Sequence, residues 1–309
     1  MPPHVFAVAR RELRYGAFDA DRAAGAMVFR EFHAVPLPEG TFGGGALGAP
    51  MGDPALFAGA LRSLLGRISG KVRQASLVLP DAWVRALLVD YGVLPRAPEA
   101  RAEVIRFRLR KLLPFRVEEL RVGAMEGGDP PGQGEVVRAL TVFASESVVA
   151  ALETAFAGEG IRVGHLSNSC LSLAAGLDYR HRLAGRFAAA MVQPEGFTLV
   201  FVRDGEPVLW RQKAFTEGIS DADRATLLTR ELRLTRSFLV DAFGEADGGP
   251  LFVAAPRDVE PFWTSVLAEG LERPVVALRA EHLPMAAEGV ALPIVDVAPL
   301  VGAACREVA

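Results

Sequence analysis

In the second half of the chain, apolar and polar positions separate into strand and helix patterns. Short apolar runs predict strands, and the run at 187–192 is continuous, as in a strand buried on both faces. Asp204-Gly205 between two such runs is a strong hairpin signal. Ser220 with Asp223 three residues later predicts the start of a long helix. The predicted order β-β-β-α-β-α-β comprises 187–192, 198–202, 207–212, 220–243, 251–255, 258–270 and 275–278.

The first half opens with a weaker version of the same order. Three apolar segments predict strands, and the Pro- and Gly-containing segment 36–40 ends the third. Asp53 followed by Pro54 predicts the capped start of a helix. A β-β-β-α-β unit that occurs twice is the plan of the actin and sugar-kinase superfamily. The first copy comprises 5–9, 13–18, 27–35, 54–68 and 76–79.

An insertion with the predicted order β-α-β-β-α separates the two copies. Its first segment, 83–89, fits either a strand or a short helix. Helical spacing of apolar residues predicts a helix over 99–113, which Pro114 stops. The remaining segments are strands at 120–125 and 136–144, a helix from Ser145 to Ala157, and a strand at 161–166 that returns to the main sheet.

Composition narrows the class of protein. The chain has 309 residues, of which 50% are hydrophobic and 23% charged, with a net charge of -3. This is an ordinary globular composition for about two domains, without the basic excess that nucleic-acid binding requires. Two cysteines exclude a disulfide framework and a zinc ribbon, and the five histidines lack metal-ligand spacing, so no metal site is expected. The most apolar run, 290–305, is broken by two prolines and an aspartate, so we expect no membrane span. The N-terminal segment 1–14 carries three arginines with no apolar stretch after them, so we expect no signal peptide.

Seven segments, in matching order, resemble the PilM family, the actin-like component of type IV pilus assembly. The most characteristic is Leu109 to Leu120, in which a helix ends in an apolar-Pro-Phe stretch followed by acidic residues. Each segment alone is weakly specific, but their common order covers nearly the whole chain. The others are Pro36–Gly40, Val78–Pro80, Leu94–Pro95, Gly158–Leu166, Arg203–Pro207 and Leu300–Arg306.

This resemblance implies an α/β fold of the actin type, with duplicated ribonuclease H-like lobes. The insertion then stands at the position that the inserted subdomain occupies in FtsA. The expected divisions are 1–80 and 161–186 for the first lobe, 81–160 for the inserted subdomain, 187–289 for the second lobe, and 290–309 for a C-terminal helix that closes the first lobe.

The resemblance also locates three nucleotide-binding loops, and this chain departs from the family in all of them. In the first loop, Ala7 replaces an aspartate and Ala9 a glycine, while Arg10 and Arg11 replace the small residues that let phosphate approach backbone amides. These changes remove a metal anchor and a phosphate cradle together. The alternative is that the two arginines bind phosphate through their charge.

The second and third loops are also altered. Met191 replaces the second aspartate and Gln193 its glycine, and the adenosine-side turn keeps one glycine, Gly218. We therefore expect a pseudo-ATPase, with no catalytic residues and no bound ATP or magnesium, although both are expected in the family.

The function that the resemblance implies is that of a cytoplasmic scaffold, peripheral at the inner membrane through a partner. Such proteins hold the short cytoplasmic N-terminal tail of the membrane protein PilN between the main lobe and the inserted subdomain, and they meet other inner-membrane and motor components of the pilus. At that boundary we expect partner-binding residues Leu79, Pro80, Leu112, Pro114 and Phe115. The alternative role of each is packing within the subdomain core.

Three other hypotheses remain. A GspL-like cytoplasmic component of a type II secretion system has a related fold, but that family continues into a membrane span, and this chain ends at Ala309 without one. An active actin-like ATPase or sugar kinase would need the missing aspartates. Finally, the arginines of 99–116 either meet anionic lipid headgroups or form a solvated face, and composition favours the solvated face.

Overall fold

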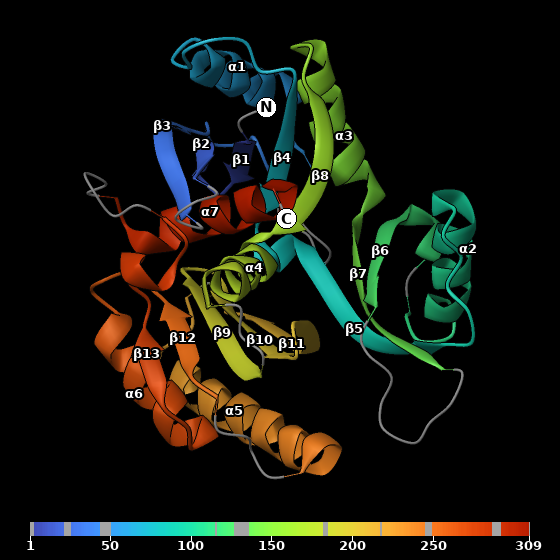
Figure 1. The fold of residues 1–309 in the computed structure, drawn as a ribbon, viewed down its shortest axis with the longest axis vertical. Coiled ribbons are helices and arrows are strands. Elements are labelled where there is room, and N and C mark those ends of the chain that lie inside the picture. The colour runs from blue at the N-terminus through green and yellow to red at the C-terminus, as the bar shows by residue number, and fades with distance from the viewer. Residues whose placement is uncertain are drawn as a thin grey trace.

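Two five-stranded sheets and one three-stranded sheet form the framework of the protein (Figure 1). Each five-stranded sheet and its covering helices make up a lobe, and the three-stranded sheet belongs to a segment inserted into the first lobe. The computed structural model describes residues 3–21, 26–43, 51–114, 116–126, 136–181, 185–216, 218–244, 249–285 and 292–308.

The sheet of the first lobe has the order β3-β2-β1-β4-β8. Its first three strands are antiparallel, and β4 and β8 run parallel to β1. The central strands β1 and β4 are buried over almost their whole length, which explains their continuous apolar sequences. The bounds are β1 His4–Val8, β2 Glu12–Asp21, β3 Ala26–Pro36, β4 Gln74–Leu79 and β8 Arg162–Asn168.

The second lobe repeats this arrangement as β11-β10-β9-β12-β13, with the same parallel and antiparallel senses. Asp204 and Gly205 form the turn between β10 and β11 with φ values of 52° and 81°, as the hairpin signal predicts. The duplicated order expected of actin-like lobes is therefore confirmed. The bounds are β9 Arg186–Gln193, β10 Gly196–Arg203, β11 Glu206–Ala214, β12 Leu251–Ala254 and β13 Val275–Ala277.

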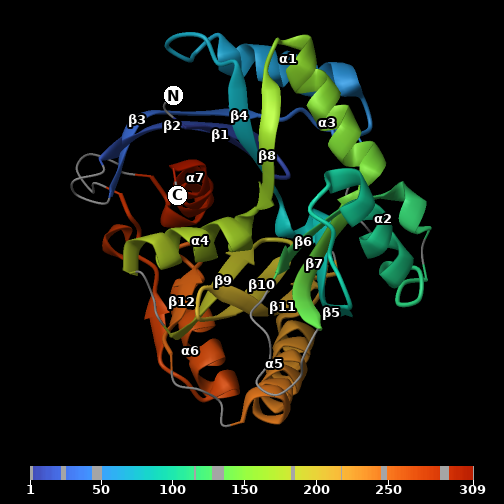
Figure 2. The same ribbon diagram turned by 45° about the vertical axis from the view of Figure 1, so that its right-hand side comes forward.

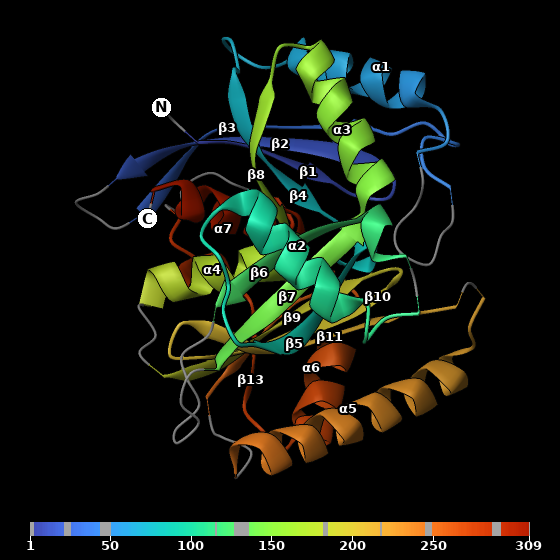
Figure 3. The same ribbon diagram turned by 90° about the vertical axis from the view of Figure 1, so that its right-hand side faces the viewer.

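The inserted segment forms an antiparallel sheet, β5-β7-β6, with one helix on its outer face (Figure 3). The segment that fitted either a strand or a helix is the strand β5, whose buried and less buried positions broadly alternate. The helix ends at Leu109 rather than at 113: residues 110–112 form a turn, and residue 113 leaves the helical conformation directly before Pro114. The bounds are β5 Val84–Tyr91, α2 Pro98–Leu109, β6 Leu120–Glu126 and β7 Val137–Ser145.

Helix α3 (Glu146–Gly158) connects the insertion back to β8 and packs beside α1 (Pro54–Leu65) on one face of the first sheet (Figure 2). Its buried side chains lie in the core of the first lobe, where Phe156 contacts Phe57 and Phe6. The expected division counts this helix with the inserted subdomain. In the structure it is the crossover helix that parallel strands such as β4 and β8 require.

Helices α5 (Asp221–Phe243) and α6 (Glu260–Leu271) cover the outer face of the second sheet (Figure 3). The predicted caps of α5 are present: the Ser220 hydroxyl accepts a hydrogen bond from the backbone N–H of Asp223, and Gly244 ends the helix with φ 83°. Among the described residues, no helix combines the length and apolar character needed to cross a bilayer.

Helices α4 (Ser169–His181) and α7 (Ile294–Val308) lie side by side between the two sheets (Figures 1 and 2). Two glycines allow their close approach, since a Cβ atom on Gly176 would lie 3.2 Å from the Cα of Gly302. One apolar cluster runs from the first sheet through both helices to the second sheet. The two lobes are therefore joined by a continuous core.

Candidate functional site

The two positions at which the resemblance predicts a replaced aspartate lie inside the core between the lobes. Ala7 in β1 is 6% exposed, and Met191 in β9 is 1% exposed. Both belong to the apolar cluster that continues through Cys170 of α4. A carboxylate at either position would lose its hydration among apolar neighbours. In this chain the two positions contribute packing.

The loops that follow these strands are tight turns. The backbone N–H of Ala9 donates to the carbonyl of Glu12 at 2.8 Å, which leaves Arg10 and Arg11 exposed at the tip. In the second lobe, Gln193 ends β9, and in the third loop the remaining glycine, Gly218, is exposed with φ 75°. The arginine side chains are thus directed to the surface rather than into the shared core.

A buried carboxyl group that the motifs did not single out lies where β4 meets α4. Asp81 is 1% exposed, and its Oδ1 accepts a hydrogen bond of 3.0 Å from the backbone N–H of Cys170. Burial raises the pKa of Asp81 to about 7, against the opposing effect of hydrogen bonds from Cys170, Thr198 and Ser169. Burial and the neighbouring Asp81 also raise the pKa of the Cys170 thiol, which makes this cysteine unreactive. An aspartate directly after a buried strand and a proline is the only sequence signal for this group.

An open cavity of about 320 Å³ lies between the inserted sheet and the first lobe. Two of its walls are β6 and β8, and each is an edge strand of its own sheet. The lining is mostly apolar, with a few polar side chains among the apolar ones. It consists of Leu79, Val84, Arg121, Val122, Gly123, Ala124, Met125, Val142, Phe143, Ala144, His165, Leu166, Ser167, Asn168, Leu171 and Arg306.

Arg121 fixes the position of the inserted sheet relative to the first lobe. Its guanidinium group, on β6, donates to the Glu146 carboxylate at 2.8 Å and to the Glu153 carboxylate at 2.9 Å, both on α3. The two hydrogen-bonded carboxylates raise the pKa of Arg121, and the same contact lowers the pKa of Glu146. This three-residue network spans the cavity wall and holds one guanidinium group in a defined orientation.

Two further polar groups lie at the other side of the cavity. The Nε2 atom of His165 is buried and has no hydrogen-bond partner among the described residues, and burial together with the charge of Arg306 lowers the pKa of His165. Arg306, in the last turns of α7, approaches the sulfur of Met125 at 3.6 Å. Burial lowers the pKa of Arg306 as well. The cavity therefore combines an apolar floor with cationic and imidazole groups.

The structure brings only part of the predicted partner-binding set to this cavity. Leu79 lines it, and Pro80 is buried just behind, before the short 3-10 helix Asp81–Trp83. Leu112 and Pro114 lie exposed beyond the end of α2, outside the lining. Phe115 lies outside the described residues.

Most cavity residues were not predicted from the sequence. They come from β6, β7 and β8, and only the strand order brings these residues together. Each of these strands was predicted, but nothing in a strand pattern says which edge stays unpaired. Within the described ranges, no group of three or more His, Cys, Asp or Glu side chains could hold a metal ion.

Comparison with known proteins gives a structural match and no sequence match. No protein-family model matches the chain, and no curated protein matches it. A chain of the PilM–PilN type IV pilus biogenesis complex aligns over 100% of this chain and 99% of its own length, with 17% identity and a TM-score of 0.77. The cytoplasmic domain of EpsL, from the type II secretion system of Vibrio cholerae, aligns over 97% and 95% at 10% identity with a TM-score of 0.49. The chain therefore has, over its whole length, the actin-like fold found in the PilM–PilN complex.

Proposed function

We propose that this protein is a non-enzymatic adaptor of a type IV pilus assembly complex, which binds the short cytoplasmic tail of a PilN-like membrane protein. The observation that carries this proposal is the apolar cavity bounded by two edge strands from different sheets. The matched structure is that of a complex between PilM and PilN, and that pairing supports the choice of partner.

The two edge strands supply the binding mode. Among the described residues, β6 pairs only with β7, and β8 pairs only with β4, so each leaves one row of backbone groups unpaired. An extended peptide can add to such an edge through main-chain hydrogen bonds, while alternate side chains enter pockets. The cavity volume of about 320 Å³ suits a few side chains of a tail rather than a folded domain.

The apolar side of the cavity supplies the affinity. Leu79, Met125, Val142 and Leu166 line it, and the first lobe and the inserted sheet each contribute two of them. A tail with apolar side chains at alternate positions would bury them there. The proposed tail-binding site therefore includes Leu79 and residues of β6, β7 and β8, and it excludes Leu112 and Pro114. Pro80 is buried next to Leu79 and supports the site.

The buried state of Ala7 and Met191 supports an adaptor over an ATPase. In an actin-like nucleotide site, carboxylates at these positions face solvent, phosphate and metal, whereas here both positions pack in the core between the lobes. The proposed adaptor would act in the cytoplasm and reach the inner membrane through its partner, where it would also meet other assembly and motor components.

A direct binding assay tests the proposal. A fluorescent synthetic peptide with the N-terminal sequence of the PilN-like protein encoded in the same pilus operon is titrated with the purified full chain. A Cβ atom added to Gly123, in β6, would meet open space, so Gly123→Arg should fold. Alternate residues of a strand share one face, and Arg121 and Met125 lie on the cavity side, so the new side chain should fill the cavity. We expect saturable binding by the wild type and at least about tenfold weaker binding by Gly123→Arg.

Gly158→Arg, at the exposed end of α3, is the matched control, because its Cβ would also meet open space and it lies outside the cavity lining. It should bind the peptide like the wild type. A folded wild-type protein that does not bind the peptide overturns the proposal, and equal loss in both variants would mean that the cavity is not the site.

A further inference from the structure

The inserted subdomain carries the three most exposed large apolar side chains among the described residues. Val93, Phe107 and Leu112 are 73%, 57% and 56% exposed. Phe107 lies in the last turns of α2, and Leu112 follows directly after the helix end. The opposite side of α2 buries Ile105 and Leu109 against the sheet. Exposed apolar side chains of this size, concentrated around one helix, are unusual unless the surface binds something.

Basic side chains surround these apolar ones. The segment 101–116 contains six basic residues and one acidic residue, whereas the whole chain has a net charge of -3. Lys111 extends over the ring of Phe107, with its Nζ 5.1 Å from the ring centroid. The guanidinium groups of Arg106 and Arg108 donate to main-chain carbonyls of Leu120 and Asp90.

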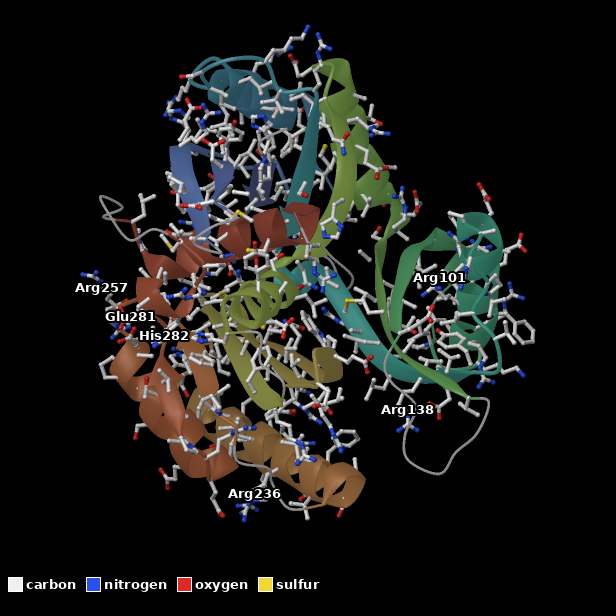
Figure 4. The ribbon with its side chains drawn as sticks, viewed as in Figure 1. Arg101, Arg138, Arg236, Arg257, Glu281 and His282 are labelled. Atoms are coloured by element: carbon white, nitrogen blue, oxygen red, sulfur yellow. The ribbon has the colours of Figure 1, made fainter. Side chains whose placement is uncertain are left out.

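Arg108 and Lys111 are exposed, whereas the Nε atom of Arg106 is buried. Arg108 and Lys111 form no salt bridge with a carboxylate among the described residues, unlike Arg110, which pairs with Glu118 at 2.6 Å. The charge of Arg108 contributes to the lowered pKa of Asp90, and that of Arg106 to the lowered pKa of Glu146. Arg101, labelled in Figure 4, turns instead toward β6 and pairs with Glu126. We call the exposed residues Phe107, Arg108, Lys111 and Leu112 the α2 face.

Helix α5 also exposes apolar side chains, but its local charge differs from that of the α2 face. Leu234 and Phe238 of α5 are also exposed, at 47% and 36%. However, α5 contains as many acidic as basic residues. Of these two surfaces, only the α2 face combines exposed apolar side chains with a local excess of positive charge, which is the combination that an anionic membrane surface attracts.

We propose that the α2 face docks directly on an anionic lipid bilayer. Phe107 and Leu112 enter the headgroup region, and the exposed cations Arg108 and Lys111 face the lipid phosphates, with their stems along apolar surface. This contact is additional to the partner tail and does not depend on it.

The position of α2 leaves the proposed tail site free. Helix α2 packs on the face of the inserted sheet that includes Leu120 and Phe143, whereas Met125 and Val142 pack toward the lobes. The figures show α2 as the outermost element of the insertion, on the side away from both lobes (Figures 1 and 3). Membrane docking and tail binding therefore use opposite faces of the same sheet.

Vesicle flotation tests the proposal with the full chain alone. We expect the wild type to float with vesicles of phosphatidylcholine and phosphatidylglycerol, not with pure phosphatidylcholine, and to be released by high salt. The double variant Phe107→Ser/Leu112→Ser should bind anionic vesicles about tenfold more weakly, and Lys111→Ala about fivefold. The control Leu234→Ser/Phe262→Ser removes two comparably exposed apolar side chains elsewhere and should float like the wild type.

A fluorescence measurement tests the same contact without relying on variants that could lose binding because they unfold. Phe107→Trp places a reporter on the α2 face, and its emission should shift to the blue with anionic vesicles, while the shift should be absent for Phe262→Trp on α6. Wild-type protein that stays unbound, or binding that the α2-face variants leave unchanged, overturns the proposal. A dimer that the double variant dissociates, without vesicle binding, would assign the surface to a second copy and also overturn it.

Discussion

The carboxylate of Asp81 accepts a hydrogen bond of 3.0 Å from the backbone N–H of Cys170, in the first turn of α4. This contact joins the end of β4 to the helix that packs between the two lobes. It also satisfies one of the amides that a helix leaves unpaired at its N-terminus, where negative charge is favoured. A buried protein carboxyl group therefore caps this helix in the core between the lobes, although burial opposes its ionisation.

Stability should fall as the pH rises because of Asp81. Its pKa is about 7 in the folded protein and near 4 in the unfolded chain, so between these values the folded state holds a proton that the unfolded state has lost. The free energy of unfolding should then decrease by up to about 1.4 kcal/mol per pH unit in this window. Asp81→Asn should remove that slope, as measured by urea unfolding at pH values from about 5 to 8.

Asp204→Asn is the control, because Asp204 is exposed in the hairpin turn and should leave the slope as in the wild type. If wild type and Asp81→Asn show the same pH dependence, Asp81 is not protonated in the folded protein near pH 6.

Restoring an aspartate should not restore nucleotide binding. Met191→Asp places a carboxylate among apolar side chains without a cation partner, which should cost about 3 kcal/mol or more of folding free energy. Met191→Leu conserves volume and should cost less than about 1.5 kcal/mol.

Isothermal titration of the wild type with Mg-ATP and Mg-ADP should give no binding heat. Micromolar binding would contradict the expected loss of the nucleotide site. It would favour the alternative hypothesis that Arg10 and Arg11 bind phosphate.

The contact between α4 and α7 should be the least tolerant of added volume. A Cβ atom on Gly302 would overlap the carbonyl oxygen of Ser172, a backbone atom that cannot yield without moving α4. Gly302→Ala should therefore lower stability by about 2 kcal/mol, as measured by chemical denaturation. Gly59→Ala, inside α1 with open space around its Cβ, should instead raise stability by about 0.5–1 kcal/mol. Equal effects of the two substitutions would mean that the helices separate readily.

Local signals in the sequence were sufficient where neighbours along the chain determine the structure. The hairpin at Asp204-Gly205 and the cap at Ser220 depend on backbone conformation and on hydrogen bonds within three residues, and both are confirmed. The segment 83–89 stayed ambiguous because a short apolar run carries too little periodicity, and pairing with β7 makes most of it the strand β5.

Non-local contacts decided the candidate site. Asp81 and Cys170 are 89 residues apart in sequence, so no local pattern could show that the carboxyl group is buried. Leu112 falls inside the predicted helix 99–113, on the apolar side with Ile105 and Leu109, but the helix ends at Leu109 and leaves Leu112 exposed. Helix α3 follows the insertion in sequence, yet it completes the core of the first lobe.

The sequence by itself determined the duplicated order of strands and helices and most of their ends, and its resemblance to PilM proteins predicts that Ala7 and Met191 stand where those proteins have aspartates. These features rest on residue periodicity, turn chemistry and side-chain identity, which are local properties. Only the tertiary structure decided that those two residues pack in a core shared by the lobes, that edge strands β6 and β8 border one cavity, and that Phe107 stays exposed. The physical reason is that burial and edge pairing are set by contacts between segments far apart in the chain.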